Sequence, residues 1–149
     1  LPVHISPEDD RINSADPCFV VPVKRHGITD GLPLQQPPLV AGYNRFVAKG
    51  AAEVILSVAR YTTALGKSTD NRVRISQTSH DPFLVLGSWG NGKTAALASD
   101  LAPHWVGGFV DWGDTRVSLV GTDREVEVGG WYLQFVRQLL AWCGLPNAG

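Results

Sequence analysis

Two short, almost wholly apolar runs constrain the fold of this 149-residue chain more than any other feature. Residues 51–59 read AAEVILSVA, and residues 83–86 read FLVL. An apolar stretch of this length is typical of a strand that is covered on both faces, as in an α/β sheet. We therefore expect two buried strands within one domain that spans residues 1–149, a length that suits a single domain.

One helix is predicted near the C-terminus, at residues 131–143. Gly144 supplies a C-terminal cap, and Pro146 prevents the helix from continuing. The apolar positions recur at the spacing of one helical face, which we expect to pack on the sheet. That face consists of Tyr132, Phe135, Val136, Leu139, Leu140 and Cys143.

The first forty residues favour loops and an edge strand. Residues 18–23, CFVVPV, are predicted to form that edge strand, because Pro22 cannot donate a ladder hydrogen bond. Prolines break any helical pattern in this part of the chain. They are Pro2, Pro7, Pro17, Pro22, Pro33, Pro37 and Pro38.

The rest of the chain predicts short elements. Residues 61–78 are polar and are expected to form a connection with a weak strand at residues 73–76. Residues 117–120 and 126–128 are further strand candidates. The expected fold class is α/β, with a mixed sheet and a C-terminal helix.

Residues 87–94, GSWGNGKT, satisfy the phosphate-binding pattern G-x-x-x-x-G-K-[ST] at every required position. In such a loop Lys93 would reach the β- and γ-phosphates, and Thr94 would bind magnesium. Trp89 argues against this interpretation, because its ring stands where the chain must wrap closely around phosphate. No apolar strand ending in an acidic residue follows to complete a magnesium site. We prefer a hairpin, in which FLVLG and KTAALAS are antiparallel strands joined by a glycine-rich turn.

Composition limits the classes of partner. Thirteen basic and fourteen acidic residues leave a net charge of -1, which predicts no nucleic-acid or anionic-membrane partner. No apolar run approaches the roughly 20 residues that span a bilayer, and no stretch resembles a secretory signal. Cys18 and Cys143 form no disulfide framework, and no histidines have metal-ligand spacing. We expect a cytoplasmic protein with no metal and no other cofactor; because it contains no methionine, we also expect a processed, trimmed or partial product.

Residues 99–105, SDLAPHW, follow the second strand of the expected hairpin. Open α/β folds place their sites at the C-terminal ends of sheet strands. Asp100 could orient the imidazole of His104 in a general acid–base pair. Alternatively, Asp100 caps a short helical turn and His104 is a surface or packed histidine, which the residues alone favour slightly.

Four residues are candidates for the lining of a pocket. Tyr43 and Asn44 precede a buried strand and could form a rim, or Asn44 could satisfy a tight turn. Trp105 and Trp112 flank the His104 region and could roof the pocket. Packing in the core or at a subunit contact is the safer account for most of the tryptophans.

Several strings occur in order over almost the whole chain. They are LPVHISPEDDR, HGITDGLP, GYNRFVAKGAAEVIL, GSWGNGKTAALASDLAPHW, FVDWG and EVGGWYLQFVRQLLAW. Together they resemble the glutamine amidotransferase-like family related to the class I amidotransferases. The resemblance implies a flavodoxin-like α/β sandwich, of which this chain is the C-terminal part. It also implies a strand–turn–strand at residues 87–94 and a Cys–His–Glu triad in active members.

Of that triad, only His104 has a matching position here. The family's usual order is His-Pro-Glu, whereas Trp105 and Val106 follow His104. Asp100, Asp111 and Glu127 are alternatives for the carboxylate, among which the sequence does not choose.

The resemblance implies that the nucleophile lies in a part of the family domain that precedes this chain. Cys18 has no elbow glycines around it and is expected to be structural. Cys143 is expected on the buried face of the last helix, as a small core residue.

The resemblance implies a small-molecule substrate, glutamine or another amide, and hydrolysis that depends on cysteine and histidine. The alternative is a catalytically inactive binding or assembly module of the same fold, and nucleotide binding is a third hypothesis. A partial domain would leave the sheet short of strands and a pocket open on one side. We expect such exposed surface to favour association into a homo-oligomer.

Overall fold

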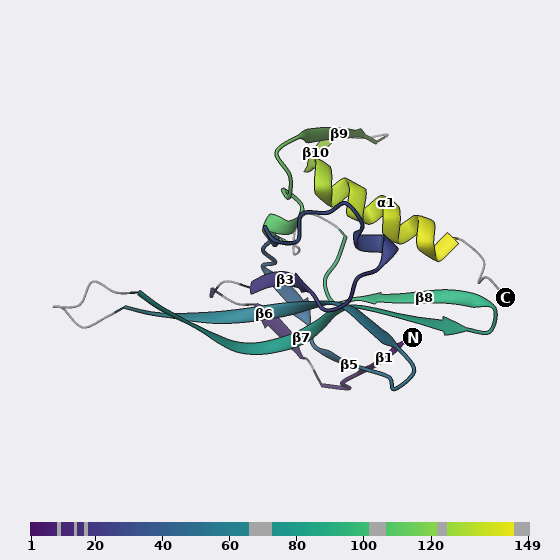
Figure 1. The fold of residues 1–149 in the computed structure, drawn as a ribbon, viewed down its shortest axis with the longest axis horizontal. Coiled ribbons are helices and arrows are strands. Elements are labelled where there is room, and N and C mark those ends of the chain that lie inside the picture. Colours follow the sequence, from purple (N-terminus) through teal and green to yellow (C-terminus); the bar gives the residue numbers. More distant parts are fainter. Residues whose placement is uncertain are drawn as a thin grey trace.

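A four-stranded antiparallel sheet lies at the centre of the computed structural model (Figure 1). The structure describes residues 1–8, 10–13, 15–16, 18–65, 73–101, 107–121 and 125–144, without the side chain of Leu65. In spatial order its strands are β3 (Cys18–Pro22), β6 (Glu53–Leu65), β7 (Val73–Trp89) and β8 (Gly92–Leu97). Three two-stranded sheets surround it: β1 (Val3–Ile5) with β5 (Phe46–Ala48), β2 (Arg11–Asn13) with β4 (Gly42–Asn44), and β9 (Arg116–Val120) with β10 (Glu125–Gly129). The helical elements are η1 (Gly27–Thr29), η2 (Gly107–Phe109) and α1 (Gly130–Gly144).

The two apolar runs form the buried middle of β6 and β7, as predicted. Ile55 and Leu56 are at most 1% exposed, and Phe83, Leu84 and Val85 are fully buried. Because successive strand residues point to opposite faces, both faces of the sheet are covered here. Every pairing among the described strands is antiparallel, so this part of the chain does not contain the parallel pair that the expected mixed sheet requires.

The edge strand is also confirmed. β3 pairs with β6 on one side only, and Pro22 is its last residue. On its open side the backbone N–H of Val20 donates to Pro38 O at 2.9 Å, and that of Val40 donates to Cys18 O at 3.0 Å. The loop before β4 therefore covers the edge of the sheet.

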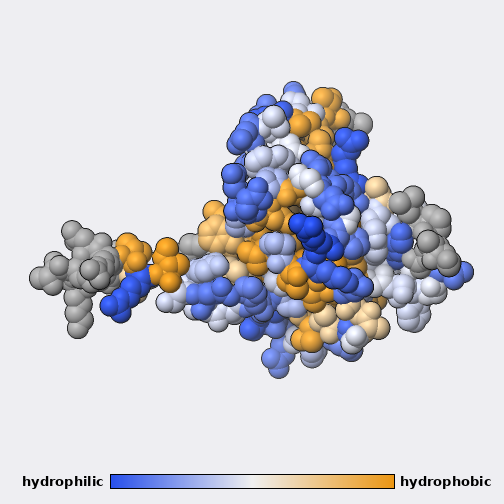
Figure 2. Space-filling view, in the orientation of Figure 1, coloured by the Kyte–Doolittle hydropathy of each residue, from blue (hydrophilic) through white to orange (hydrophobic). Residues whose placement is uncertain are grey.

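β6 and β7 continue beyond the body of the molecule as a long two-stranded arm (Figure 1). The strand predicted at residues 73–76 is confirmed as the start of β7, whereas the prediction of a connection is wrong for residues 61–65 and 77–78, which also belong to strands. Most of these residues are polar because the arm is exposed. Its two strands are held together by cross-strand hydrogen bonds and not by burial of apolar side chains. Val73 and Ile75 leave apolar side chains in solvent, 55% and 66% exposed, in the apolar patch on the arm in Figure 2.

The GSWGNGKT motif is a hairpin. Gly87 pairs with Thr94 and Trp89 with Gly92, so Gly90 and Asn91 form a two-residue turn between β7 and β8. Gly90 has φ of 56°, whereas no described non-glycine residue has positive φ. Glycine at the first turn position with negative φ at the second is typical of a type II′ hairpin turn. A phosphate-binding loop would need a helix after Lys93, so the nucleotide-binding hypothesis is wrong.

Helix α1 packs on the sheet through its predicted apolar face. Phe109 of η2 lies between the layers, with its ring centroid 5.3 Å from those of Tyr132 and Phe135 and 5.9 Å from that of Phe83. The prediction extends this buried face too far along the helix. Cys143 is exposed and Leu140 is 60% exposed, because the last turn reaches past the layer of core side chains.

Candidate functional site

The segment that follows β8 is held on both sides by backbone contacts. Ala98 donates its N–H to Phe83 O at 2.8 Å and accepts from Asn44 N at 2.7 Å. The Ser99 hydroxyl then donates to Gly42 O at 2.8 Å. These bonds tie the chain before Asp100 to both β7 and β4.

Helix α1 holds the other side of Asp100. The Tyr132 hydroxyl donates to Leu101 O at 2.8 Å. Burial raises the pKa of Tyr132, and the negative charge of Asp100 raises it further. Tyr132 therefore remains a neutral hydrogen-bond donor, close enough to Asp100 to sense its charge.

The structure separates the three carboxylates that the sequence left open. Asp100 is half-buried at the end of β8. Asp111 is exposed and pairs with Arg116 at 2.7 Å. Glu127 is exposed on β10, opposite Ser118. Asp100 is the one of the three that lies in a sheltered position after a sheet strand.

An apolar cavity of about 360 Å³ adjoins this segment. It lies between α1 and the β9–β10 hairpin and includes Leu101 and Tyr132 in its lining. Its size is at the lower end of typical ligand sites. The other lining residues are Val110, Leu119, Gly121, Val126, Val128, Leu133 and Val136.

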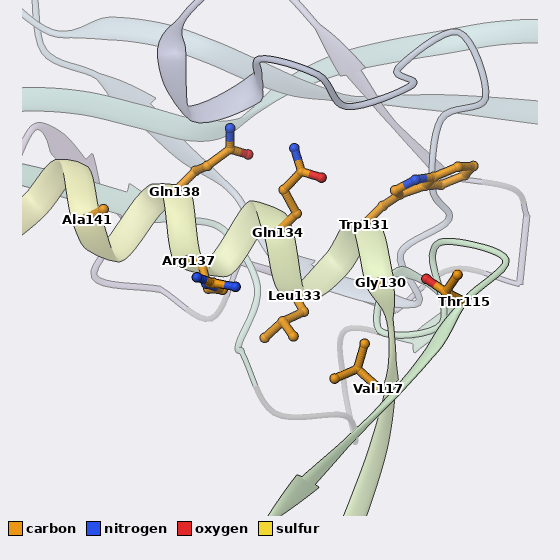
Figure 3. A pocket seen from close by; sticks show the side chains of 9 residues that line it. All are labelled: Thr115, Val117, Gly130, Trp131, Leu133, Gln134, Arg137, Gln138 and Ala141. Carbon is orange, nitrogen blue, oxygen red and sulfur yellow. The ribbon is translucent and has the colours of Figure 1, made fainter.

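A second cavity, of about 780 Å³, follows the outer side of α1 (Figure 3). Arg137, Gln134 and Gln138 give it polar lining, and Thr115 and Val117 close it on the β9 side. The Gln134 and Gln138 amides both donate to Asp30 O, at 3.2 and 3.0 Å, so they fix the loop after η1 onto the helix. Sequence reasoning missed this role, because the contacts span more than a hundred residues.

His104 and Trp105 lie outside the described residues. Trp112 is buried, and its indole N–H donates to Gln36 O at 3.0 Å. Its carbonyl oxygen accepts the N–H groups of Trp131 and Tyr132, both at 3.2 Å, at the start of α1. A Cβ on Gly129 would lie 2.1 Å from this oxygen, which explains why glycine precedes the helix.

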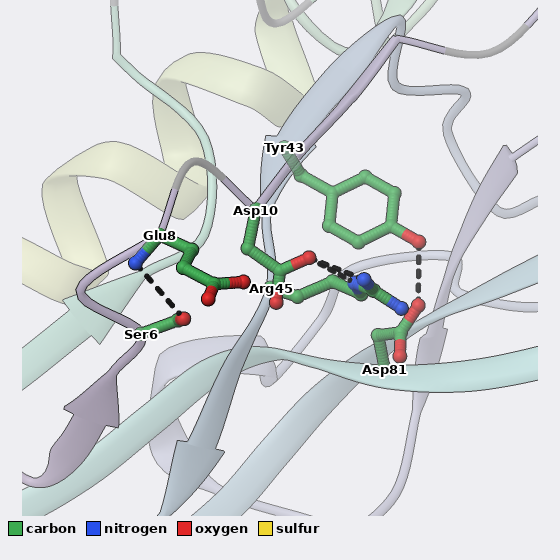
Figure 4. Close-up of polar contacts among 6 residues, drawn as sticks. All are labelled: Ser6, Glu8, Asp10, Tyr43, Arg45 and Asp81. Carbon is green, nitrogen blue, oxygen red and sulfur yellow. Dashed lines mark hydrogen bonds and ion pairs between the residues drawn. The ribbon is translucent and has the colours of Figure 1, made fainter.

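Tyr43 and Asn44 differ in how far their side chains are buried. Tyr43 is fully buried, and its hydroxyl donates to Asp81 Oδ2 at 2.6 Å (Figure 4). Burial and the Asp81 carboxylate raise the pKa of Tyr43 above its usual value, and Arg60 opposes this. Asn44 is exposed, with its backbone N–H bonded to Ala98.

Tyr43 belongs to a polar cluster that sequence reasoning did not predict (Figure 4). The Arg45 guanidinium binds Asp10 through Nε, at 2.7 Å, and through Nη2. Asp10 raises the pKa of Arg45, and the charge of Asp81 adds to this effect. The cluster joins β4, β7 and the segment before β2, which makes it a structural brace between sheets.

The two thiols lie away from Asp100. Cys18 is buried on β3, at the opposite edge of the sheet from β8, about 14 Å away at the usual strand spacing. Cys143 is eleven residues beyond Tyr132 on α1, about 16 Å along the helix axis. Partial burial raises the pKa of Cys143, while Lys93 lowers it. Neither thiol is placed to act with Asp100.

Within the part of the chain that the structure describes, no group of three or more His, Cys, Asp or Glu side chains could hold a metal ion. In the same residues no helix is both long and apolar enough to cross a membrane.

The fold and the site define a mixed α/β domain with one C-terminal helix and a sheltered carboxylate after a sheet strand. A family model described as "Putative glutamine amidotransferase" matches residues 1–119, and the chain belongs to this family. The resemblance inferred from the sequence is thereby confirmed.

The solved structures similar to the chain include two proteins from Salmonella. Cytoplasmic Protein STM3548 from Salmonella typhimurium is 26% identical with a TM-score of 0.64, and the match covers 96% of this chain and 43% of that one. Cytoplasmic Protein STM1381 from Salmonella typhimurium LT2 is 30% identical with a TM-score of 0.51, covering 70% of this chain and 34% of that one. This chain therefore spans less than half the length of either structure. No curated protein matches the chain.

Proposed function

We propose that this chain supplies a histidine and a carboxylate to an amide-hydrolysing site of the glutamine amidotransferase type. His104 acts as the general base that activates a cysteine nucleophile, and Asp100 orients the imidazole. The substrate is a small amide, glutamine or another. Membership of the family supports the reaction class.

The observation that carries this proposal is the position of Asp100. Hydrogen bonds from Ser99 to Gly42 and from Tyr132 to Leu101 hold the backbone on both sides of this half-buried carboxylate. An orienting carboxylate must keep its own place while the imidazole moves a proton, so a fixed backbone suits the role. The adjoining apolar cavity of about 360 Å³ suits the rim of a small substrate site.

The nucleophile in this proposal comes from outside the chain. Cys18 is buried at the far edge of the sheet, and Cys143 lies at the distant end of α1. The finer fold assignment, the C-terminal part of a flavodoxin-like sandwich, belongs to the same proposal. It is compatible with the 43% coverage of the longer Salmonella protein. A cytoplasmic location is also proposed, since both similar structures are named as cytoplasmic proteins.

Glutamate release from glutamine by the intact gene product tests the proposal. His104→Ala should lower kcat by about 10²–10⁴-fold, the usual contribution of a general base. His80→Ala is the matched control, because His80 is exposed on β7 and should leave the rate unchanged. Cys18→Ser and Cys143→Ser should also leave it unchanged. Absence of turnover, or full activity of His104→Ala, would overturn the proposal.

A catalytically inactive binding or assembly module is the second candidate. The distance of both thiols from Asp100 favours it. This candidate predicts that the intact gene product binds glutamine in a calorimetric titration and releases no glutamate. Steady turnover would exclude it.

A further inference from the structure

A cavity of about 260 Å³ lies at the C-terminal end of α1, apart from the Asp100 segment. Trp142, which contributes to it, is ten residues beyond Tyr132, about 15 Å along the helix axis. Strands β6, β7 and β8 and the loop before η1 form the remaining walls. Its polar and aromatic lining consists of His26, Glu53, Ser88, Lys93 and Trp142.

Two rings shape this cavity. The ring centroids of His26 and Trp142 are 5.7 Å apart, with the planes at 76°. His26 Nδ1 accepts the N–H of Ile28 at 3.1 Å, so a neutral His26 carries its proton on Nε2. The cavity lining therefore includes a ring N–H donor beside an indole face.

The charged side chains in and around the cavity leave a net positive charge. Lys93 Nζ lies 5.2 Å from the centroid of the Trp142 ring, and no described carboxylate pairs with it. Glu53 is paired with Lys24 at 2.9 Å, and this lysine lowers the pKa of Glu53, so the carboxylate is ionised. Lys24, Glu53 and Lys93 together leave one positive charge.

We propose that this cavity binds a small monocarboxylate. The carboxylate pairs with the Lys93 ammonium and accepts from His26 or the Ser88 hydroxyl, since charge-assisted hydrogen bonds are the strongest available here. The body of the ligand lies against the Trp142 ring and Leu86. A dianion such as phosphate fits less well, because it would bring a second negative charge toward Glu53.

Lys93, which the phosphate-binding pattern also marked, has a different role in this site. It lies on β8, directly after the β7–β8 turn, and its amine lies over the Trp142 ring near the end of α1. The proposal does not depend on the proposed amide hydrolysis, because it shares no residue with the Asp100 segment.

Titration of the ¹⁵N-labelled 149-residue chain with sodium propionate tests the proposal. Shifts should concentrate at Lys93, Ser88 and the Trp142 indole N–H, with a dissociation constant on the order of 1 mM for a ligand of this size. Trp142→Phe assigns the indole signal. Sodium chloride at equal ionic strength should leave these signals in place.

Lys93→Gln removes the charge and keeps a polar side chain that is one atom shorter. It should weaken propionate binding by about ten-fold or more, the loss expected for one charge-assisted hydrogen bond. Arg74→Gln is the matched control, since Arg74 is exposed on the arm, far from β8 (Figure 1), and should bind as the unmodified chain does. Retained signal dispersion shows that each variant is folded.

The proposal fails if propionate causes no shifts in the cavity, or if chloride or phosphate causes the same shifts at the same concentration. It also fails if a folded Lys93→Gln variant binds as tightly as the Arg74→Gln control.

Discussion

The hydroxyl of the fully buried Tyr43 donates to the Asp81 carboxylate and so joins β4 to the central sheet. Neither residue predicts the other, since they are 38 positions apart. The sequence suggested a pocket rim for Tyr43, because a polar cluster before a buried strand suits such a rim. Because the ring is buried, the bond to Asp81 replaces hydrogen bonds that water would otherwise supply to the hydroxyl.

Tyr43→Phe should lower the free energy of unfolding by about 1–3 kcal/mol at neutral pH, because it leaves the Asp81 oxygen without its donor. The pKa of Tyr43 is raised in the folded state, so above its usual value near pH 10 the unfolded chain loses the proton first and stability falls as pH rises. The difference in the free energy of unfolding between the unmodified chain and the Tyr43→Phe variant should therefore become smaller above about pH 10.

Urea denaturation at pH 7 and above pH 10 measures both effects. Tyr61→Phe is the control, since the Tyr61 hydroxyl bonds to no described residue, and it should change stability by less than about 0.5 kcal/mol. A Tyr43→Phe variant as stable as this control would show that the Asp81 bond is absent in solution.

At the scale of elements, local sequence patterns predict some helices and strands, whereas others depend on pairing with distant parts of the chain. Helix α1 and the strands β6, β7, β9 and β10 were predictable, because apolar period and apolar runs mark them directly. The arm was only partly predictable, because residues 73–76 carry a weak strand signal whereas residues 61–65 carry no core face. Their pairing is an extension of the register set in the buried half of β6 and β7.

The β7–β8 turn gives a prediction at this scale. Gly90 sits at φ of 56°, which costs an L-residue roughly 1–2 kcal/mol. Gly90→Ala should lower the free energy of unfolding by about that amount. Asn91→Ala should cost less than about 0.5 kcal/mol, since Asn91 has no positive φ and an exposed side chain.

Thermal or urea denaturation of the two variants distinguishes the turn types. An equal loss for both substitutions would indicate positive φ at both turn positions and would contradict the type II′ assignment.

For the whole molecule, the family followed from the sequence, whereas the contacts around the candidate site did not. Asp100 could be identified as a candidate because it follows a strand. The hydrogen bond from Tyr132 to the neighbouring Leu101 depends on α1 folding back over the end of β8, since the two residues are 31 positions apart. Sequence alone offered no way to choose among Asp100, Asp111 and Glu127, since only burial and ion pairing separate them.

The choice of Asp100 is the central claim, and a comparison of three variants tests it most directly. Glutamate release by the intact gene product should fall by about 10²-fold or more in Asp100→Asn, as expected when the group that orients a general base is lost. Asp111→Asn and Glu127→Gln should stay within about two-fold of the unmodified protein, because both carboxylates are exposed. Full activity of Asp100→Asn, or an equal loss in either of the other two, would contradict the account.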